Sequence, residues 1–307
     1  MRHLSACVFV TLALSACGDE TPVRFTEVDA TPAVDVLDAA DPDAPVSYDA
    51  PAPLDRGTVP TDIPVGGMTV VYAHSDSALF SVDPSSRAVH MVGMFRFPTD
   101  GNNHSMTDLA VNADGEITGV TQDALYRIDP DTAACTLIRS LPATDQRVFV
   151  GLTWVPVGVL DPAREVLLGG ATDGTLWRID PSTGRTASVG SLSSGWGISG
   201  DMVSIAGAAT YATVRRTTGT STADSLVTLT FTTSGTSTTA RMTTVGTITG
   251  YQSIYGLGYW RSTLYGFTRA GHLITINVRT GAGTDVSMPT MQFSGAGVTT
   301  VAPVAPP

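Results

Sequence analysis

The feature that most restricts the fold of this chain is a motif that recurs five times at nearly constant spacing. Each copy carries a leucine inside a short alternating segment, and the leucines are Leu79, Leu125, Leu176, Leu226 and Leu273. The intervals between them are 46, 51, 50 and 47 residues. A period of this length, kept from residue 67 onward, indicates five copies of one supersecondary unit.

Each unit contains four segments with the alternating or fully apolar pattern of short β-strands. In the first unit these segments are TVVYAHS, ALFSVDPSS, HMVGMF and SMTDLAV. Four short strands in a unit of roughly 40–50 residues is typical of a β-propeller blade. The sequence therefore predicts an all-β, five-bladed propeller over residues 67–303, with four antiparallel strands per blade and a short tail at 304–307.

The two ends of the repeat predict how the ring closes. The first unit has no preceding strand of the SMTDLAV type, and the last strand of that type, SGAGVTT at residues 294–300, has no unit after it. We expect this C-terminal strand to complete the N-terminal blade, because that pairing removes an open sheet edge.

A turn motif, IDPSTG at residues 179–184, follows the leucine segment. The Asp180 carboxylate is suited to accept backbone N–H groups two residues on, Pro181 presets a type I turn, and Gly184 suits a left-handed position. A calcium loop would need several oxygen ligands, whereas three of the five copies have one aspartate at this position and the other two have none. We interpret the motif as a structural turn.

These repeats resemble bacterial five-bladed propeller domains with LYxIDPxTG-type repeats, and more loosely gluconolactonase-like and other propeller families. The resemblance implies that ligands meet the face opposite the Asp-Pro turns. Gluconolactonase-like propellers hold a divalent metal in a ring of Glu and Asn or Asp, and no such ring is evident here. Glu116 and Glu165 both fall at the starts of outer strands, so we predict neither a metal site nor a cofactor.

The N-terminus has the pattern of a bacterial lipoprotein signal. Arg2 precedes an apolar run at residues 4–14, and LSAC at 14–17 places Cys17 as the lipidated residue. The run is too short for a stable bilayer-spanning helix. A plain secretory signal cleaved after Ala16 is the alternative. We expect a signal peptide at 1–16 and a protein anchored by lipid on Cys17 in the bacterial envelope, at the periplasmic or surface face of the outer membrane.

Residues 17–66 differ in composition from the repeats. Eleven acidic residues stand against two arginines, and the stretch is rich in Ala and Pro. Such a composition cannot bury enough apolar surface to offset chain entropy, so it predicts a disordered, extended tether. The chain has a net charge of −11, and this acidity argues against nucleic acid as a partner. Cys135 is then left alone in an apolar segment, where we expect a buried filler.

The segments between blades carry the candidate binding residues, which are Asn103, His104, Asp108, Trp196, Asp201, Tyr251 and Tyr255. Carboxylates, amides and aromatic faces around a channel mouth are suited to a sugar or a cation. The structural alternative is that Asp108 and Asp201 bond backbone amides at strand starts while the aromatic residues fill gaps between blades.

No nucleotide, zinc-protease or serine-hydrolase motif is present. We therefore expect a monomeric, non-catalytic binding module for a glycan or an envelope protein. Two alternatives stay open. One is a structural subunit of an envelope assembly, and the other is a hydrolase or lactonase that uses Asp108, Asp201 and His104.

Overall fold

The computed structural model describes residues 70–141, 148–235, 237–288 and 291–304, and all regular secondary structure in these ranges is β. The predicted signal peptide, Cys17 and the predicted tether lie outside the described residues. Within the ranges that are described, no helix has the length and apolarity to cross a membrane.

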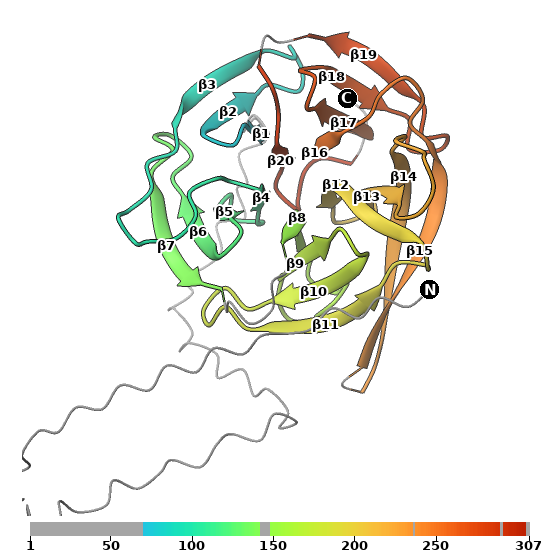
Figure 1. Ribbon diagram of the computed structural model, residues 1–307, viewed down its shortest axis with the longest axis horizontal. Coiled ribbons are helices and arrows are strands. Elements are labelled where there is room, and N and C mark those ends of the chain that lie inside the picture. Colours follow the sequence, from blue (N-terminus) through green and yellow to red (C-terminus); the bar gives the residue numbers. More distant parts are fainter. Residues whose placement is uncertain (1–69, 142–147, 236, 289–290, 305–307) are drawn as a thin grey trace, which may run out of the picture. The chain divides into compact units, whose positions relative to one another are not determined.

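The described strands form five antiparallel sheets of four strands each, arranged in a ring as predicted (Figure 1). From the innermost strand outward, the first blade is β20 (Gly295–Gly297), β1 (Val71–His74), β2 (Ala78–Val82) and β3 (Val89–Met94). The second is β4 (Asp108–Val111), β5 (Ile117–Val120), β6 (Ala124–Ile128) and β7 (Cys135–Ser140). The third is β8 (Phe149–Val155), β9 (Val166–Ala171), β10 (Thr175–Ile179) and β11 (Thr186–Ser191). The fourth is β12 (Trp196–Ser204), β13 (Thr210–Arg216), β14 (Ser225–Ser234) and β15 (Ser237–Thr247), and the fifth is β16 (Ile254–Trp260), β17 (Thr263–Thr268), β18 (Leu273–Ile276) and β19 (Gly283–Ser287).

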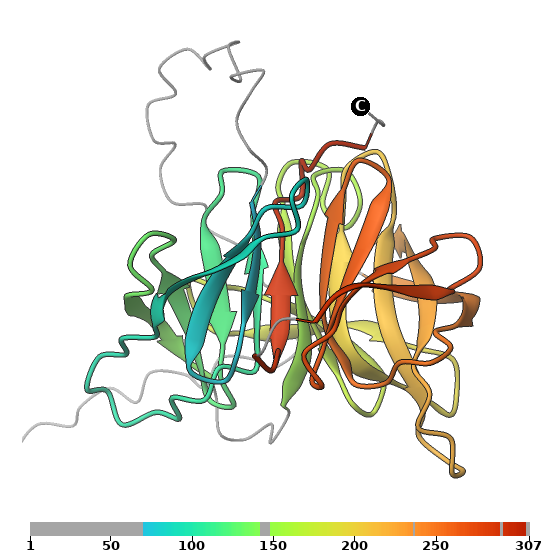
Figure 2. The ribbon, with the colours of Figure 1, turned by 90° about the horizontal axis from the view of Figure 1, so that it is seen from above.

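The ring closes through its C-terminal strand, which confirms the prediction from the repeat ends. β20 pairs antiparallel with β1 in the register Tyr72↔Gly297, Ala73↔Ala296 and His74↔Gly295. Figure 2 shows the red β20 standing in the centre beside the first blade. The pairing covers the inner edge of β1, which would otherwise expose unpaired backbone groups.

The five anchor leucines lie on the third strand of each blade and are 0% exposed. They face the neighbouring sheets, where burial of one leucine side chain contributes roughly 1.5–3 kcal/mol. Glycines allow the inner strands to approach: a Cβ on Gly200 would lie 1.9 Å from the Ile254 carbonyl oxygen of the next blade. The repeat thus encodes both the apolar contacts and the close backbone contacts between blades.

The Asp-Pro turns join the third and fourth strands of the blades. The Asp180 carboxylate accepts the Ser182 N–H at 2.8 Å and the Thr183 hydroxyl at 2.6 Å. Partial burial raises its pKa, but these hydrogen bonds outweigh burial and hold the pKa of Asp180 below its ordinary value. Gly184 has a φ of 72° and so occupies the left-handed region. Asn277 accepts N–H groups in the same way in the fifth blade.

Candidate functional site

Five equivalent positions surround the axis of the ring, one on the inner strand of each blade. They are Asp108, Gly151, Asp201, Gly256 and Gly295. The residue that follows each of them donates its backbone N–H toward the axis. The glycines are required by space, since a Cβ on Gly295 would lie 2.4 Å from Asp108 Oδ1. Two carboxylates therefore fill a centre that three glycines leave open.

The two aspartates collect one backbone N–H from every blade. Asp108 accepts from Leu109 at 2.8 Å and from Leu152 of the third blade at 2.6 Å. Asp201 accepts from Met202 at 2.5 Å and from Leu257 of the fifth blade at 2.6 Å. The N–H of Ala296, in the first blade, also bonds to Asp201. This is the structural alternative considered from sequence, extended to the whole ring.

Both aspartate side chains are 0% exposed and bond to each other. Burial raises the pKa of Asp108 well above its usual range, and the neighbouring charge of Asp201 raises it further. Burial also raises the pKa of Asp201, although the bonds from Asp108 and from backbone N–H groups act in the opposite direction. The pair is therefore expected to share one proton.

His74 lies beside this pair and is also fully buried. Its Nδ1 is 2.8 Å from the Ser75 carbonyl oxygen, which places the proton on Nδ1 and leaves Nε2 facing Asp108 Oδ1 at 3.7 Å. Burial lowers the pKa of His74 to about 4, so the imidazole is neutral near pH 7. In the described ranges, no group of three or more His, Cys, Asp or Glu side chains is placed to hold a metal ion.

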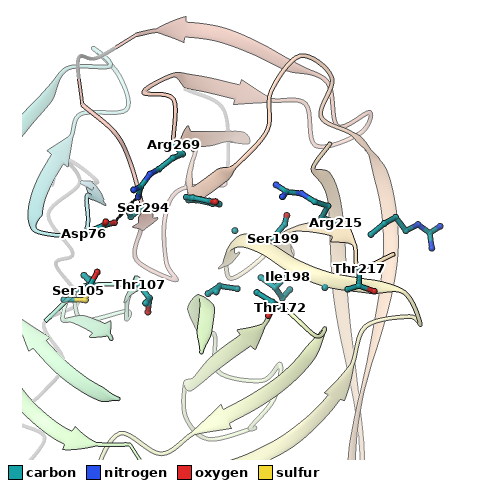
Figure 3. A pocket seen from close by; sticks show the side chains of 16 residues that line it. Asp76, Ser105, Thr107, Thr172, Ile198, Ser199, Arg215, Thr217, Arg269 and Ser294 are labelled. Carbon is teal, nitrogen blue, oxygen red and sulfur yellow. Dashed lines mark hydrogen bonds and ion pairs between the residues drawn. The ribbon is translucent and has the colours of Figure 1, made fainter. Parts of the chain in front are cut away.

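A pocket of about 440 Å³ lies at one mouth of the ring and is lined by residues from all five blades (Figure 3). Its lining includes Thr107 and Gly200, the chain neighbours of Asp108 and Asp201. The pocket is on the face that carries the connections between blades and the turns between second and third strands. The Asp-Pro turns lie at the opposite face, because successive strands in a blade run in opposite directions.

Two arginines stand at the rim of this pocket. Arg269 Nη1 bonds to Asp76 Oδ1 at 3.1 Å and to Ser294 Oγ at 2.9 Å. Arg215, in the fourth blade, donates Nε and Nη2 to Asp224 Oδ1 at 3.1 and 2.7 Å. Asp224 is itself 0% exposed, so the Arg215 guanidinium is held by a buried partner.

The predicted site residues divide between this pocket and other places. Tyr255 lines the pocket, whereas Asp108 and Asp201 lie buried next to lining residues in the chain. Trp196 precedes the lining residue Gly197, and its ring is covered by the Arg216 guanidinium at 4.1 Å. Tyr251 lies apart, against the His272 ring and a second, smaller cavity.

Asn103 and His104 belong to a separate cluster in the connection before β4. The His104 ring stacks on Phe97, with centroids 4.6 Å apart, and its Nε2 is 2.8 Å from Asp100 Oδ1. The Asn103 side-chain oxygen accepts the Ser105 N–H at 2.7 Å. Neither residue lines the central pocket, so the structure does not bring His104 to the two carboxylates. A binding role for these seven residues stays a prediction.

Sequence reasoning missed Arg215, Arg269 and His74. Arg215 lies near the end of the second strand of the fourth blade, and Arg269 follows the second strand of the fifth blade. Both positions are at the face opposite the Asp-Pro turns. His74 has the same position at the end of β1. The signal that could have found all three was their shared place in the repeat.

The fold and the pocket define a five-bladed β-propeller with a small-molecule-sized cavity at one mouth of its ring. Neither a scan against protein-family models nor a search of curated protein sequences finds a match. Structural similarity extends to several solved propeller-like chains. A protein of unknown function from Bacteroides caccae has 10% identity and a TM-score of 0.39, with 76% of this chain and 99% of that chain covered.

Two further structures are similar at the same level. Oligogalacturonate lyase in complex with manganese is 12% identical, with a TM-score of 0.36, over 72% of this chain and 62% of that one. BamB from Moraxella catarrhalis is 16% identical, with a TM-score of 0.31, over 73% of this chain and 62% of that one. Identities and scores this low carry no argument about function, and the strand order alone establishes the class.

Proposed function

We propose that this protein is a lipid-anchored protein of the bacterial cell envelope that presents its β-propeller as a non-catalytic binding module. The observation that supports binding is the central pocket, where polar side chains from five blades converge on about 440 Å³. Convergent polar groups in one concave site are typical of small-molecule sites. A glycan, or a polar group of an envelope protein, is the proposed partner of the monomer.

The anchoring part of the proposal is supported by the sequence. LSAC at 14–17 follows an apolar run, and the acidic stretch that comes next has the composition of a tether. Growth of cells expressing the full chain with a clickable palmitate analogue tests it. We expect the label on the wild type and on Cys7→Ala, but not on Cys17→Ala. Label on Cys17→Ala would contradict this part of the proposal.

The binding part is tested by filling the pocket. Ser105 is exposed and lines the rim, so Ser105→Trp is expected to narrow the cavity while the protein still folds. Thr239→Trp, at an exposed position on β15, is the matched control. Ligand-observed NMR with a library of small polar molecules and full-length protein in detergent measures binding. We expect hits that Ser105→Trp weakens and Thr239→Trp does not; equal binding by both variants would contradict the assigned pocket.

A further inference from the structure

The charged side chains at the rim of the central pocket are predominantly basic. Three arginines, Arg215, Arg216 and Arg269, line it against one carboxylate, Asp76. Arg216 lies over the Trp196 ring, whereas Arg215 and Arg269 reach the opening from two neighbouring blades, the fourth and the fifth (Figure 3). Basic groups gather here although the chain as a whole has a net charge of −11.

Arg269 keeps donors that its partners do not use. Both side-chain bonds that Arg269 makes to the described residues, to Asp76 and to Ser294, come from Nη1. Within the described part of the chain, Nε and Nη2 have no partner, and the side chain is 44% exposed. The Nε and Nη2 hydrogens of a guanidinium form a planar pair that matches the two oxygens of a carboxylate.

Arg215, in the neighbouring fourth blade, is positioned to donate a further hydrogen bond to a carboxylate in the pocket. Its Nε and Nη2 are engaged by the buried Asp224, whose second oxygen accepts the Ile254 N–H at 3.0 Å. This anchoring fixes the guanidinium before any ligand arrives, and Nη1 has no hydrogen-bond partner among the described residues. Positioning a charged donor in advance lowers the entropic cost of binding.

The rest of the lining consists largely of hydroxyl groups, among them Ser105, Thr107, Ser199 and Thr217. Ser199 Oγ is buried and has no hydrogen-bond partner among the described residues. Val150 and Ile198 add apolar contact on the same wall.

We propose that the central pocket binds a small polyhydroxy carboxylate, with Arg269 holding the carboxylate, Arg215 supporting it, and hydroxyl side chains of the lining, such as the exposed Ser105, bonding ligand hydroxyls. This inference rests on the proposed function and specifies its ligand class. It replaces the cation considered from sequence, because the rim presents guanidinium donors while the two central carboxylates are buried beneath it.

Three compounds with the same sugar skeleton test the proposal: glucuronate, glucuronamide and glucosamine, titrated by calorimetry into full-length protein in detergent. We expect glucuronate to bind roughly ten- to hundredfold more tightly than the amide, since a hydrogen bond to a charged group is lost. Glucose 6-phosphate distinguishes a carboxylate site from a general anion site, and we expect weaker binding than for glucuronate.

Arg269→Gln is the decisive variant, because its ion pair is exposed and its loss is expected to change stability little. It should remove the preference for glucuronate over the amide. Arg185→Gln, exposed at the Asp-Pro turn on the opposite face, should retain it. Thermal melting verifies that both variants fold.

The outcomes separate this proposal from the one on which it rests. Binding of the amide or the amine as tightly as glucuronate, still weakened by Ser105→Trp, would overturn the ligand class and leave the binding module standing. Stronger binding of the phosphate would overturn the carboxylate in favour of a general anion. Absence of binding by the whole panel would overturn the ligand class, and the library experiment then decides on the pocket itself.

Discussion

Replacing Asp108 by Asn is expected to change how the stability of the propeller depends on pH. In the wild type, the Asp108 carboxyl group bonds to Asp201 while its oxygens accept the N–H groups of Leu109 and Leu152, and we expect the pair to hold one proton. An asparagine side chain still donates to Asp201, but its amide nitrogen cannot accept an N–H. The variant therefore keeps the central hydrogen bond, loses one acceptor and can no longer release a proton.

The expected loss of unfolding free energy follows from these hydrogen bonds. One buried N–H left without an acceptor costs about 1–3 kcal/mol, which is a large part of a typical unfolding free energy of roughly 5–15 kcal/mol. Asp201→Ala is expected to destabilise the protein more. It leaves the Asp108 side chain without its bond to residue 201, and it leaves three backbone N–H groups without an acceptor, those of Met202, Leu257 and Ala296. We expect a loss of about 3–6 kcal/mol for Asp201→Ala.

The sign of the pH effect comes from the raised pKa of the pair. A carboxyl group whose pKa is higher in the folded than in the unfolded protein stabilises the fold most at low pH, and this contribution falls as pH rises toward the folded-state pKa. The slope approaches about −1.4 kcal/mol per pH unit while one proton is retained on folding. His74 acts in the opposite direction between about pH 4 and its ordinary value near 6.5, because burial lowers its pKa.

Urea unfolding of the full-length chain is followed by tryptophan fluorescence at several pH values from 5 to 8. His74 is present in every variant, so a difference in slope between variants reports on the carboxyl pair. As pH rises, the wild type and the exposed-site control Asp114→Asn should lose stability relative to Asp108→Asn, whose residue 108 has no proton to release. Equal slopes for the wild type and Asp108→Asn would refute the reasoning that a proton is held at the centre of the ring.

Three other perturbations have defined outcomes. Gly184→Ala should lower the free energy of unfolding, measured in urea, by about 1–2 kcal/mol, because alanine is strained at a φ of 72°. Ala187→Gly, at a strand position nearby, serves as the comparison. Gly200→Ala should lower the melting temperature far more, since its Cβ would lie 1.9 Å from a carbonyl oxygen, and a melting temperature equal to that of the wild type would contradict the close contact between blades. The buried Cys135 thiol, whose pKa burial raises to about 12, should react with a disulfide reagent only after urea is added. Rapid labelling in native buffer at pH 8 would contradict its burial.

The blades were predictable because their determinants are local. Leu79 and its four counterparts mark strands by alternation, and Asp180, Pro181 and Gly184 specify a turn through their own backbone preferences. The unpaired strand at residues 294–300 even predicted the closure of the ring, because an exposed sheet edge must find a partner. These local determinants do not depend on which side chains meet across the axis.

The site depended on contacts that no local pattern contains. Asp108 and Asp201 were selected for their place in the repeat, yet only the closed ring shows that they are buried, bond to each other and collect N–H groups from five blades. Arg269 and Asp76, which are 193 residues apart along the chain, become neighbours at the pocket rim for the same reason.

The sequence by itself thus determined the number of blades, their strand order and the chemistry of their turns, because period and propensity act within one repeat unit. The tertiary structure alone decided which residues of different blades share the axis and the pocket. Hydrogen-bond partners and the burial that shifts a pKa depend on distances between strands that the chain separates by one or more whole repeats.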